Sequence, residues 1–477
     1  MNSILFIAAM TGLATSALAL NFETEARLKM AHQIAREQNN ADLVERVKKA
    51  AASIQAGVDA AETERLLREA ESSVGIDPGG WSMAGQPLFH PSPERLAGSE
   101  SLKPKLEAAL RDGSVDGVKA TVAEWLSVLG EQAGFPDGRR PGARPGSLTI
   151  DEAGATRLFV DAMKSKGRAV RELTAGRPLP DQMLRFYAYV LDGIVTMRPS
   201  VERHAASDLA ALDALARGIA SILLKLQQPE GHFPFPDLRG RNIRFGEMIE
   251  KQLAAGAVEV REGWVVTADP NGGSQFDTGV CGVALLRAGA TYGESEWTAA
   301  GLRAADWALG QACVANFNYN AFSVSLLARA HKSSGRAEYF DGALAKFRLG
   351  VAPGQAPNGR WIDPHNARTV YHVIILRSLG DLLDVLTTDR EKEITEVKAV
   401  AAPALEVLLK EFAAMGITVE CLPELLAIAP HFPSHENLPE ALDTVAASLV
   451  EKCTDGTRVK MGSQPHQLAA VAGMVRD

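Results

Sequence analysis

The 477-residue sequence lacks most of the short motifs that mark common catalytic and cofactor sites. It contains no G-x-G-x-x-G, Walker A, H-E-x-x-H, G-x-S-x-G or C-x-x-C pattern, which leaves nucleotide, zinc-protease, serine-hydrolase and thioredoxin-like interpretations without support. It also has no excess of positive charge, because 50 Lys and Arg residues stand against 58 Asp and Glu residues and the net charge is −8. A nucleic-acid-binding protein usually needs a basic face, so this balance argues against nucleic acid as a partner.

Long apolar runs are scarce, and the one that approaches a membrane span begins at Ile4 and ends in Ala17-Leu18-Ala19. This ending is an A-x-A-like cleavage site, so we predict that residues 1–19 are a secretory signal peptide and that the protein is periplasmic or secreted. No Lys or Arg precedes the run, which leaves an uncleaved anchor or a buried first helix as alternatives. A membrane span needs about 20 apolar residues, so we expect none after cleavage.

Cysteine is also rare, with four residues in the whole chain. In an exported protein, Cys281, Cys313, Cys421 and Cys453 can form two disulfides. The simplest pairing joins the sequence neighbours, 281 with 313 and 421 with 453. Four buried free thiols are the alternative.

Strand-like alternation is confined to residues 258–269, VEVREGWVVTAD, which predict one hairpin. Elsewhere apolar residues recur at helical spacing, most clearly at 205–227, where Leu and Ile form one stripe. The same pattern predicts helices at 279–291, 296–312, 320–334, 338–349, 367–387 and 394–415. The sequence therefore predicts an all-α fold.

Two stretches rich in Pro and Gly interrupt the helical pattern. Residues 79–94 indicate an irregular connector, and 135–147 carry three Pro, three Gly and three Arg, which is the strongest linker signal in the chain. Amphipathic helices are predicted before this linker, within 22–72 and 101–130. We therefore predict an N-terminal helical region over 20–145 and a main domain over 146–477.

The helices of the main domain alternate in character with a period of about 40–55 residues, which is typical of stacked helical hairpins. One kind ends in a loop with Gly or Pro and an aromatic residue. The next kind begins near a polar cluster, namely FDTG at 276–279, NYNA at 318–321 and DPHNAR at 363–368. A closed ring of such hairpins is an α/α toroid, in which the inner loops surround a funnel.

The order FDTGVCGVALLRAGATYGE, AADWALGQ, NYNAFSVSLLARAHKSSGRAEYFDGAL and NGRWIDPHNARTVYHVIILRSL resembles the six-hairpin α/α-toroid superfamily. That group includes hydrolases of unsaturated uronyl sugars, sugar 2-epimerase-like proteins and toroid polysaccharide lyases. LLKLQQPEGHFPFPD is also similar to repeats of terpenoid-cyclase and prenyltransferase toroids. The acid motif D-x-D-D, an adjacent Asp-Asp pair and the thioester motif are absent, which argues against cyclase activity and leaves a hydrolase only isolated carboxylates.

The densest polar cluster is residues 361–372, WIDPHNARTVYH. Asp363 suits the N-cap of a helix. On that helix, His365, Arg368 and His372 fall at i, i+3 and i+7 and therefore share a face. The alternative is a capped inner helix whose His and Arg residues make structural hydrogen bonds.

This composition suits β-elimination on a uronate, which needs a group to neutralise the carboxylate, a base for the α proton and an acid for the leaving oxygen. Imidazole titrates near neutral pH and suits the base. The candidates are Arg368 and Asn366 for neutralisation, His365 and His372 for the base, and Tyr319 and Tyr371 for the acid. We also expect Trp361 and Asp363 to contact the substrate.

A second cluster, HFPFPDLRGR at 232–241, combines aromatic rings with Arg and Asp. Aromatic faces stack on sugars and Arg forks pair with carboxylates, so this loop is predicted to bind substrate. The expected contacts are His232, Phe235, Asp237, Arg239 and Arg241. The alternative is a turn-rich loop packed by Phe233 and Phe235.

Two further helix starts carry polar residues that cap the helix or face the funnel. Asp277 is a predicted N-cap or, with Asp363 or Asp237, one of the acid and base groups of a hydrolase. Asn318 precedes Tyr319 at the other start and is expected to contact substrate if this start faces the funnel.

No cofactor is expected, apart from a weak prediction of calcium bound by oxygen ligands. The candidate ligands are Glu247, Asp269, Asn271 and Asp277, and no D-x-D-x-D-G loop accompanies them. His466, in SQPHQ near the C-terminus, is predicted to be a surface residue.

These patterns together predict a periplasmic or secreted carbohydrate-active enzyme with a polysaccharide or oligosaccharide substrate. The leading hypothesis is a polysaccharide lyase that cleaves a uronate-containing glycan by β-elimination. The alternatives are a glycoside hydrolase that uses isolated Asp residues and a non-catalytic glycan-binding toroid.

Overall fold

A computed structural model describes residues 40–73, 101–129, 146–269, 271–362, 369–415, 420–454, 459–461 and 463–475, with positions 24, 27, 28, 31, 32 and 35. The predicted signal peptide, residues 1–19, lies outside the described residues. Within them, no helix has the length and apolarity needed to cross a bilayer.

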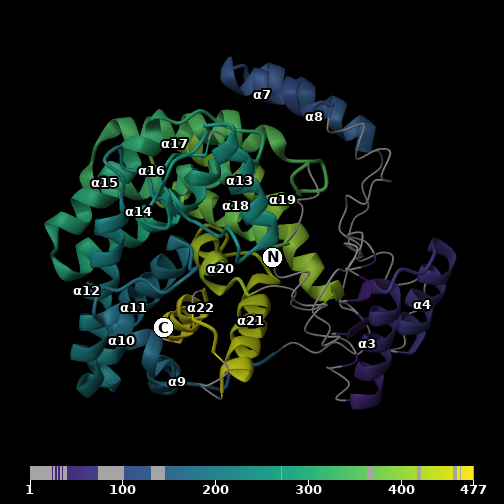
Figure 1. Cartoon of the computed structure of the whole chain (residues 1–477), viewed down its shortest axis with the longest axis horizontal. Helices are drawn as coiled ribbons and strands as arrows, with labels where there is room; N and C mark the ends of the chain where they lie inside the picture. The colour runs from purple at the N-terminus through teal and green to yellow at the C-terminus, as the bar shows by residue number, and fades with distance from the viewer. Residues whose placement is uncertain are drawn as a thin grey trace.

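Six of the described helices form a closed inner ring. Each packs against the next along the chain, and the last packs against the first. They are α11 (Leu184–His204), α14 (Gly273–Tyr292), α16 (Phe317–Ser334), α18 (Thr369–Leu383), α20 (Leu422–Ile428) and α22 (Ser463–Met474). Figure 1 shows α22, near the C-terminus, beside α11, where the ring closes.

Each inner helix also packs against one helix of an outer layer. The outer helices are α12 (Ala206–Leu226), α15 (Ser295–Gly310), α17 (Ala337–Gly350), α19 (Glu391–Met415), α21 (Leu438–Cys453) and α9 (Glu152–Ser165), the last of which covers α22. Shorter elements join them, namely α10 (Gly167–Thr174) and the 3-10 turns η1 (Ala352–Gly354) and η2 (Ala429–His431). The predicted α/α toroid is therefore confirmed.

Burial on both sides explains why the inner helices tolerate so few charged residues. One side of each inner helix faces the outer layer and the other faces the ring centre, so apolar residues extend around most of its circumference. Small residues let neighbouring helices approach, because a Cβ added at Gly279 of α14 would lie 2.7 Å from the Cβ of Phe322 on α16. Each buried Leu, Ile or Phe contributes roughly 1.5–3 kcal/mol to this packing.

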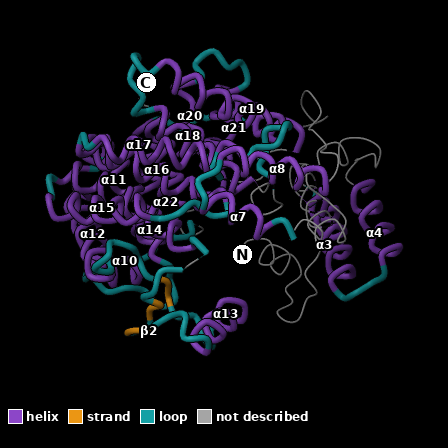
Figure 2. The backbone as a smooth tube through the Cα atoms, turned by 90° about the horizontal axis from the view of Figure 1, so that it is seen from above, coloured by secondary structure: helices purple, strands orange, loops and turns teal. Residues whose placement is uncertain are grey.

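The inner helices all run in the same direction, because an outer helix returns the chain between successive inner ones. Their N-terminal ends therefore gather at one end of the toroid, where the long connection between α12 and α14 also lies. This connection contains α13 (Ile243–Ala254) and the strands β1 (Phe235–Pro236), β2 (Val260–Arg261) and β3 (Trp264–Val265) in the antiparallel order β1-β3-β2. The hairpin predicted at 258–269 is confirmed, and Figure 2 shows α13 and β2 projecting from the ring.

The N-terminal helices form two hairpins, α3 (Ala41–Gln55) with α4 (Ala60–Ser73) and α7 (Lys103–Arg111) with α8 (Val115–Leu129). Helix α8 packs against α17 and η1, whereas α3 and α4 lie apart from the ring in Figure 1. The helices predicted within 22–72 and 101–130 are thus present, and the boundary at 145/146 stays a prediction.

The cysteines correct the disulfide prediction. All four are buried free thiols, so the pairings 281–313 and 421–453 are not formed and the alternative holds. Burial raises the pKa of the Cys281 and Cys421 thiols well above its usual range. Protonated and buried, these thiols pack as small apolar side chains.

Candidate functional site

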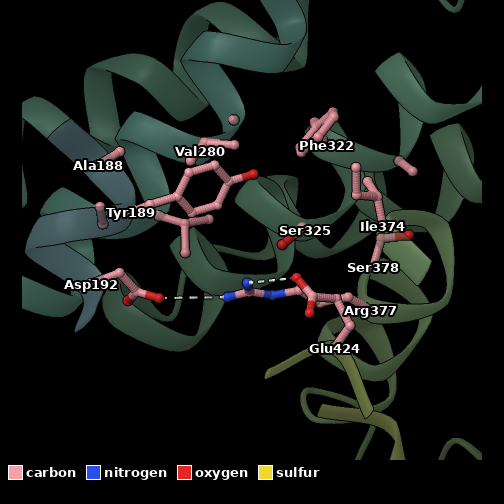
Figure 3. Close-up of a pocket in the computed structure, with 14 residues that line it drawn as sticks. Ala188, Tyr189, Asp192, Val280, Phe322, Ser325, Ile374, Arg377, Ser378 and Glu424 are labelled. Atoms are coloured by element: carbon pink, nitrogen blue, oxygen red, sulfur yellow. Dashed lines mark ion pairs between the residues drawn. The ribbon is translucent and has the colours of Figure 1, made fainter. Parts of the chain in front are cut away.

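A pocket lies inside the inner ring and is lined by residues of five inner helices (Figure 3). It contains about 510 Å³ of space between its walls, including the open mouth. The lining residues are Ala188, Tyr189 and Asp192 of α11; Gly279, Val280, Val283 and Ala284 of α14; Ala321, Phe322 and Ser325 of α16; Ile374, Arg377 and Ser378 of α18; and Glu424 of α20. Small-molecule sites combine an apolar wall with a few polar groups in the same way.

At the N-terminal end of the inner ring, one turn above the lining residue Tyr189, an arginine is fixed between a carboxylate and an aromatic stack, and we call this end of the pocket its mouth. Arg185 donates from Nε to Asp277 Oδ1 at 2.8 Å and from Nη2 to Asp277 Oδ2 at 2.6 Å. Its guanidinium carbon lies 3.6 Å from the centre of the Phe276 ring, which stacks on Phe322 at 4.0 Å and 15°. A bidentate ion pair over an aromatic face holds the guanidinium plane in one orientation.

Asp277 is therefore not the N-cap that the sequence predicted. Helix α14 begins at Gly273, one turn earlier than Asp277, and its cap position is Gly272 with φ +84°. The buried Asp277 carboxylate points across to α11 instead, because Arg185 supplies a charged partner there.

Both predicted catalytic tyrosines lie at this same end of the ring. Tyr319 is in the first turn of α16 and Tyr371 is in the first turn of α18. Tyr319 is within electrostatic reach of Tyr371, Arg185 and Asp277, and burial raises the pKa of its phenol. A phenol with a raised pKa stays protonated at neutral pH and can donate a hydrogen bond or a proton.

A third tyrosine, Tyr189, lies one turn below Arg185 on α11 and lines the pocket. Its ring stacks on His466 with the centroids 5.8 Å apart. Burial raises the pKa of Tyr189, and the nearby Glu424 carboxylate raises it further. Figure 3 shows this ring between Asp192 and Val280, directed into the pocket.

The floor of the pocket is built around Asp192. His466 Nε2 lies 2.6 Å from Asp192 Oδ2, Arg287 pairs with the other oxygen, and Arg377 Nη2 is 3.9 Å away. Burial alone would raise the pKa of Asp192, but Arg287, the hydrogen-bonded His466 and Arg377 hold it well below its usual range. The prediction that His466 is a surface residue is wrong, because α22 closes the ring and turns His466 inward.

His372 and Trp361 lie behind the pocket wall rather than in its lining. His372 Nε2 is 2.7 Å from the Ala404 carbonyl oxygen of α19, and burial, with Arg360 nearby, lowers its pKa well below its usual range. Trp361 is fully buried and donates from Nε1 to the Val351 carbonyl at 3.0 Å. Both side chains thus make structural contacts. The other predicted residues of this cluster, Asp363, His365, Asn366 and Arg368, lie outside the described residues.

The described side chains of the second predicted cluster contact each other and neighbouring segments of the chain. His232 is buried with Nε2 2.8 Å from the Val266 carbonyl, and Asp237 binds Arg239 two residues away. Arg241 pairs with Asp181, and Phe235 packs against Phe245 beside β1. None of these side chains lines the pocket, and their contacts match the alternative of a packed inter-helix loop.

The asparagines at the start of α16 are buried. Asn320 donates from Nδ2 to the Val314 and Gly350 carbonyls at 2.8 and 2.7 Å, so it fixes the preceding loop. Asn318 is fully buried beside it.

Two of the residues predicted to hold calcium, Asp269 and Asn271, are joined within one turn. Asp269 accepts from the Asn271 amide at 2.9 Å and from the Gly273 amide at 3.2 Å, which closes the turn before α14. The described part of the chain contains no group of three or more His, Cys, Asp or Glu residues that could hold a metal ion.

The sequence-based predictions did not include Arg185, Tyr189, Asp192, Arg377 and Glu424. For the last three, the available signal was a charged residue within an otherwise apolar helix, as in VLDGIV, IILRSL and LPELLA. A charge in such a place is costly to bury without a partner, so it marks a side chain that faces another polar group inside the ring.

No protein-family model matches the sequence, and no curated protein matches it. Among solved structures, the chain is similar to a family 76 glycoside hydrolase from a bovine Bacteroides thetaiotaomicron strain, at 11% identity and a TM-score of 0.43 over 66% of this chain and 77% of that one. It is also similar to an unsaturated glucuronyl hydrolase specific for heparin, at 11% identity and a TM-score of 0.28 over 65% of this chain and 99% of that one.

Proposed function

We propose that the protein is a carbohydrate-active enzyme that binds an acidic glycan at the N-terminal end of the inner ring and cleaves it by β-elimination. One observation carries this proposal. Arg185 is fixed on the Phe276–Phe322 stack at the mouth of a pocket, with Tyr319 in electrostatic reach. A cation, aromatic faces and protonated phenols are the groups that a uronate-containing glycan requires.

The electrostatics of the mouth favour an anionic substrate. The N-terminal ends of the inner helices point toward it, and each contributes a partial positive charge. Asp277 occupies one edge of the Arg185 guanidinium, and a guanidinium carries five N–H donors, so further donors are left for a substrate carboxylate.

The elimination assigns a role to each group. A base takes the proton on the carbon α to the carboxylate, the electron pair forms the carbon–carbon double bond, and the glycosidic oxygen leaves with a proton from an acid. Arg185 stabilises the charge that develops on the carboxylate. Tyr319, protonated because burial raises its pKa, supplies the leaving-group proton. Tyr371 of the neighbouring helix is the base candidate among the described residues.

Hydrolysis is less well supported by the carboxylates. A hydrolase needs two carboxyl groups able to exchange protons or attack the sugar. Asp277 is bound on both oxygens by Arg185, and Asp237 is bound by Arg239. Glu424 lines the pocket and keeps the hydrolytic alternative open as an outcome of the test.

Encounter with an extracellular glycan requires export, which we propose on the predicted signal peptide. Mass spectrometry of the protein from an exporting host checks this, with a mature N-terminus after Ala19 as the expected result. An intact first residue would argue for the uncleaved anchor.

A screen on acidic and neutral polysaccharides tests the function. Ultraviolet absorbance reports unsaturated uronyl products, and a reducing-end assay reports any cleavage. We expect both signals on uronate-containing glycans, and we expect Tyr319→Phe to remove both. The matched control is Tyr292→Phe, whose hydroxyl donates to Asp213 outside the ring. Reducing ends without absorbance would mean hydrolysis, and glycan retention without cleavage would mean a binding module.

A further inference from the structure

The floor of the pocket contains an arginine that lacks close partners. Arg377 of α18 lies between Asp192 and Glu424, with Nη2 3.9 Å from Asp192 Oδ2 and Nη1 3.9 Å from Glu424 Oε1 (Figure 3). Both distances exceed hydrogen-bond length, and within the described chain Arg377 donates no hydrogen bond. A guanidinium in a largely buried position with unused donors indicates a place for ligand oxygens.

Glu424 supplies acceptors next to these donors. Its Oε2 atom accepts from Gln467 Nε2 at 3.3 Å, and Gln467 Oε1 in turn accepts from the Leu422 amide at 2.9 Å. Helix α22 thereby fixes the carboxylate in place. The Oε1 atom lies 3.9 Å from Arg377 Nη1, so a ligand hydroxyl on the pocket side of the two atoms can reach both of them.

The charge balance of the floor selects a neutral ligand group. Asp192 already has Arg287 and His466 as close partners, and the positive charge of Arg377 is stabilised by the carboxylates of Asp381, Asp192 and Glu424. A carboxylate placed here would lie beside two carboxylates. A sugar hydroxyl both donates and accepts, so it satisfies Arg377 and Glu424 together.

The pocket lining ends at the turn of the inner helices that carries Arg377 and Glu424. Its lining residues go no further than Ala284 on α14, Ser325 on α16 and Ser378 on α18. At the next level of the ring, Asp381 accepts from Ser325 and from Arg329, which ties α16 to α18 below the floor. A pocket closed by this tie would receive the end of a glycan and would not let a chain pass through.

We propose that Arg377 and Glu424 form a terminal-sugar subsite that binds neutral ring hydroxyls, with Tyr189 and Phe322 against the sugar ring. The carboxylate-binding Arg185 lies at the mouth, so the uncharged part of the terminal sugar enters first. Cleavage from the chain end follows, and this consequence rests on the proposed function, whereas monosaccharide binding does not.

Ligand-observed NMR with glucose, galactose, mannose and glucuronate tests the subsite on the full-length protein. We expect at least one monosaccharide to bind with a millimolar dissociation constant. Glu424→Gln, which keeps the side-chain shape, and Arg377→Met should each weaken it by about tenfold or more, as expected for lost hydrogen bonds to a charged group. The matched control is Arg198→Met, which removes an arginine paired with Asp213 outside the ring and should leave binding unchanged.

Circular dichroism and thermal melting establish that each variant is folded, and Glu424→Gln keeps the test valid if Arg377→Met is unfolded. The second readout is the length of the products during digestion of a polymer. Chain-end cleavage should release products of one short length from the first minutes onward. The subsite is excluded if no monosaccharide binds wild type or if both pocket variants bind as wild type does. Early products of mixed length would exclude chain-end action. Monosaccharide binding without cleavage of any glycan would contradict the proposed function but would still support the subsite.

Discussion

Arg185 and Asp277 form a two-point ion pair, with hydrogen bonds of 2.8 and 2.6 Å, that joins α11 to α14 at the mouth of the central pocket. The two residues are 92 positions apart in the chain. The pair orients the guanidinium over the Phe276 ring and occupies both oxygens of the carboxylate. Because both carboxylate oxygens of Asp277 accept hydrogen bonds from Arg185, we interpret Asp277 as the residue that positions this cation rather than as an acid or base.

The main effect of Asp277→Asn should therefore be to lower the free energy of unfolding. The change leaves the Arg185 charge without its partner in a mostly buried place, and we expect a loss of about 3 kcal/mol in the free energy of unfolding, measured with urea. Asp213→Asn breaks the more exposed pair with Arg198 and should cost less than about 1 kcal/mol. An Asp277→Asn protein as stable as wild type would show that this pair does not stabilise the fold.

Tyr319→Phe should act on turnover. Removing the phenolic proton donor should lower kcat by about 100-fold or more with little change in KM, measured as the initial rate of absorbance on the glycan found by the screen. Because the Tyr319 pKa is raised, the wild-type rate should show no loss from deprotonation of this group up to its ordinary pKa of about 10. Wild-type turnover in the Phe variant would remove Tyr319 from the mechanism.

Asp192 should make the fold sensitive to acid. Its pKa is lower in the folded protein than in the unfolded chain, so it stabilises the fold above the unfolded value of about 3.9, and this contribution is lost as pH falls further. Asp192→Asn should be less stable than wild type at pH 7, and the difference should narrow below about pH 4. A difference that is constant with pH would show that the Asp192 charge is unimportant for stability.

His372 should also make the stability of the fold depend on pH, but at a higher pH than Asp192. Its pKa is lowered in the folded protein, so the fold loses stability as pH falls below the unfolded value of about 6.5. His372→Gln stays neutral and should flatten this part of the curve of melting temperature between pH 7 and 5. If the variant melts as wild type does at every pH but has lost turnover, His372 is catalytic, as its spacing with His365 and Arg368 suggested.

The toroid was predictable because its signal is local. The stripe at 205–227 and the later helical runs follow from spacing within single helices, and the ring of hairpins follows from their period. The same spacing could not tell which side of α18 faces the centre. His372 and Arg377 are both polar residues in one apolar helix, yet the first binds the Ala404 carbonyl of α19 and the second lines the pocket.

The site was predictable in part. Tyr319 and Tyr371 were expected at the funnel because polar residues at inner-helix starts gather at one end, and they do lie there. The role of the loop at 232–241 stays a prediction, because aromatic and charged residues have the same sequence signal whether they bind a sugar or each other. Arg185 and Glu424 became recognisable only through partners on other helices, and those distances are set by ring closure.

The most direct measurement counts unsaturated uronyl groups against new reducing ends in one digestion of a uronate-containing glycan. Elimination predicts one unsaturated group for each new reducing end. Both should fall together in Arg185→Met, because the carboxylate then loses its cation, while the Arg198→Met control stays at the wild-type level. New reducing ends without unsaturated groups, or no cleavage of any acidic glycan by the folded wild-type protein, would contradict the account.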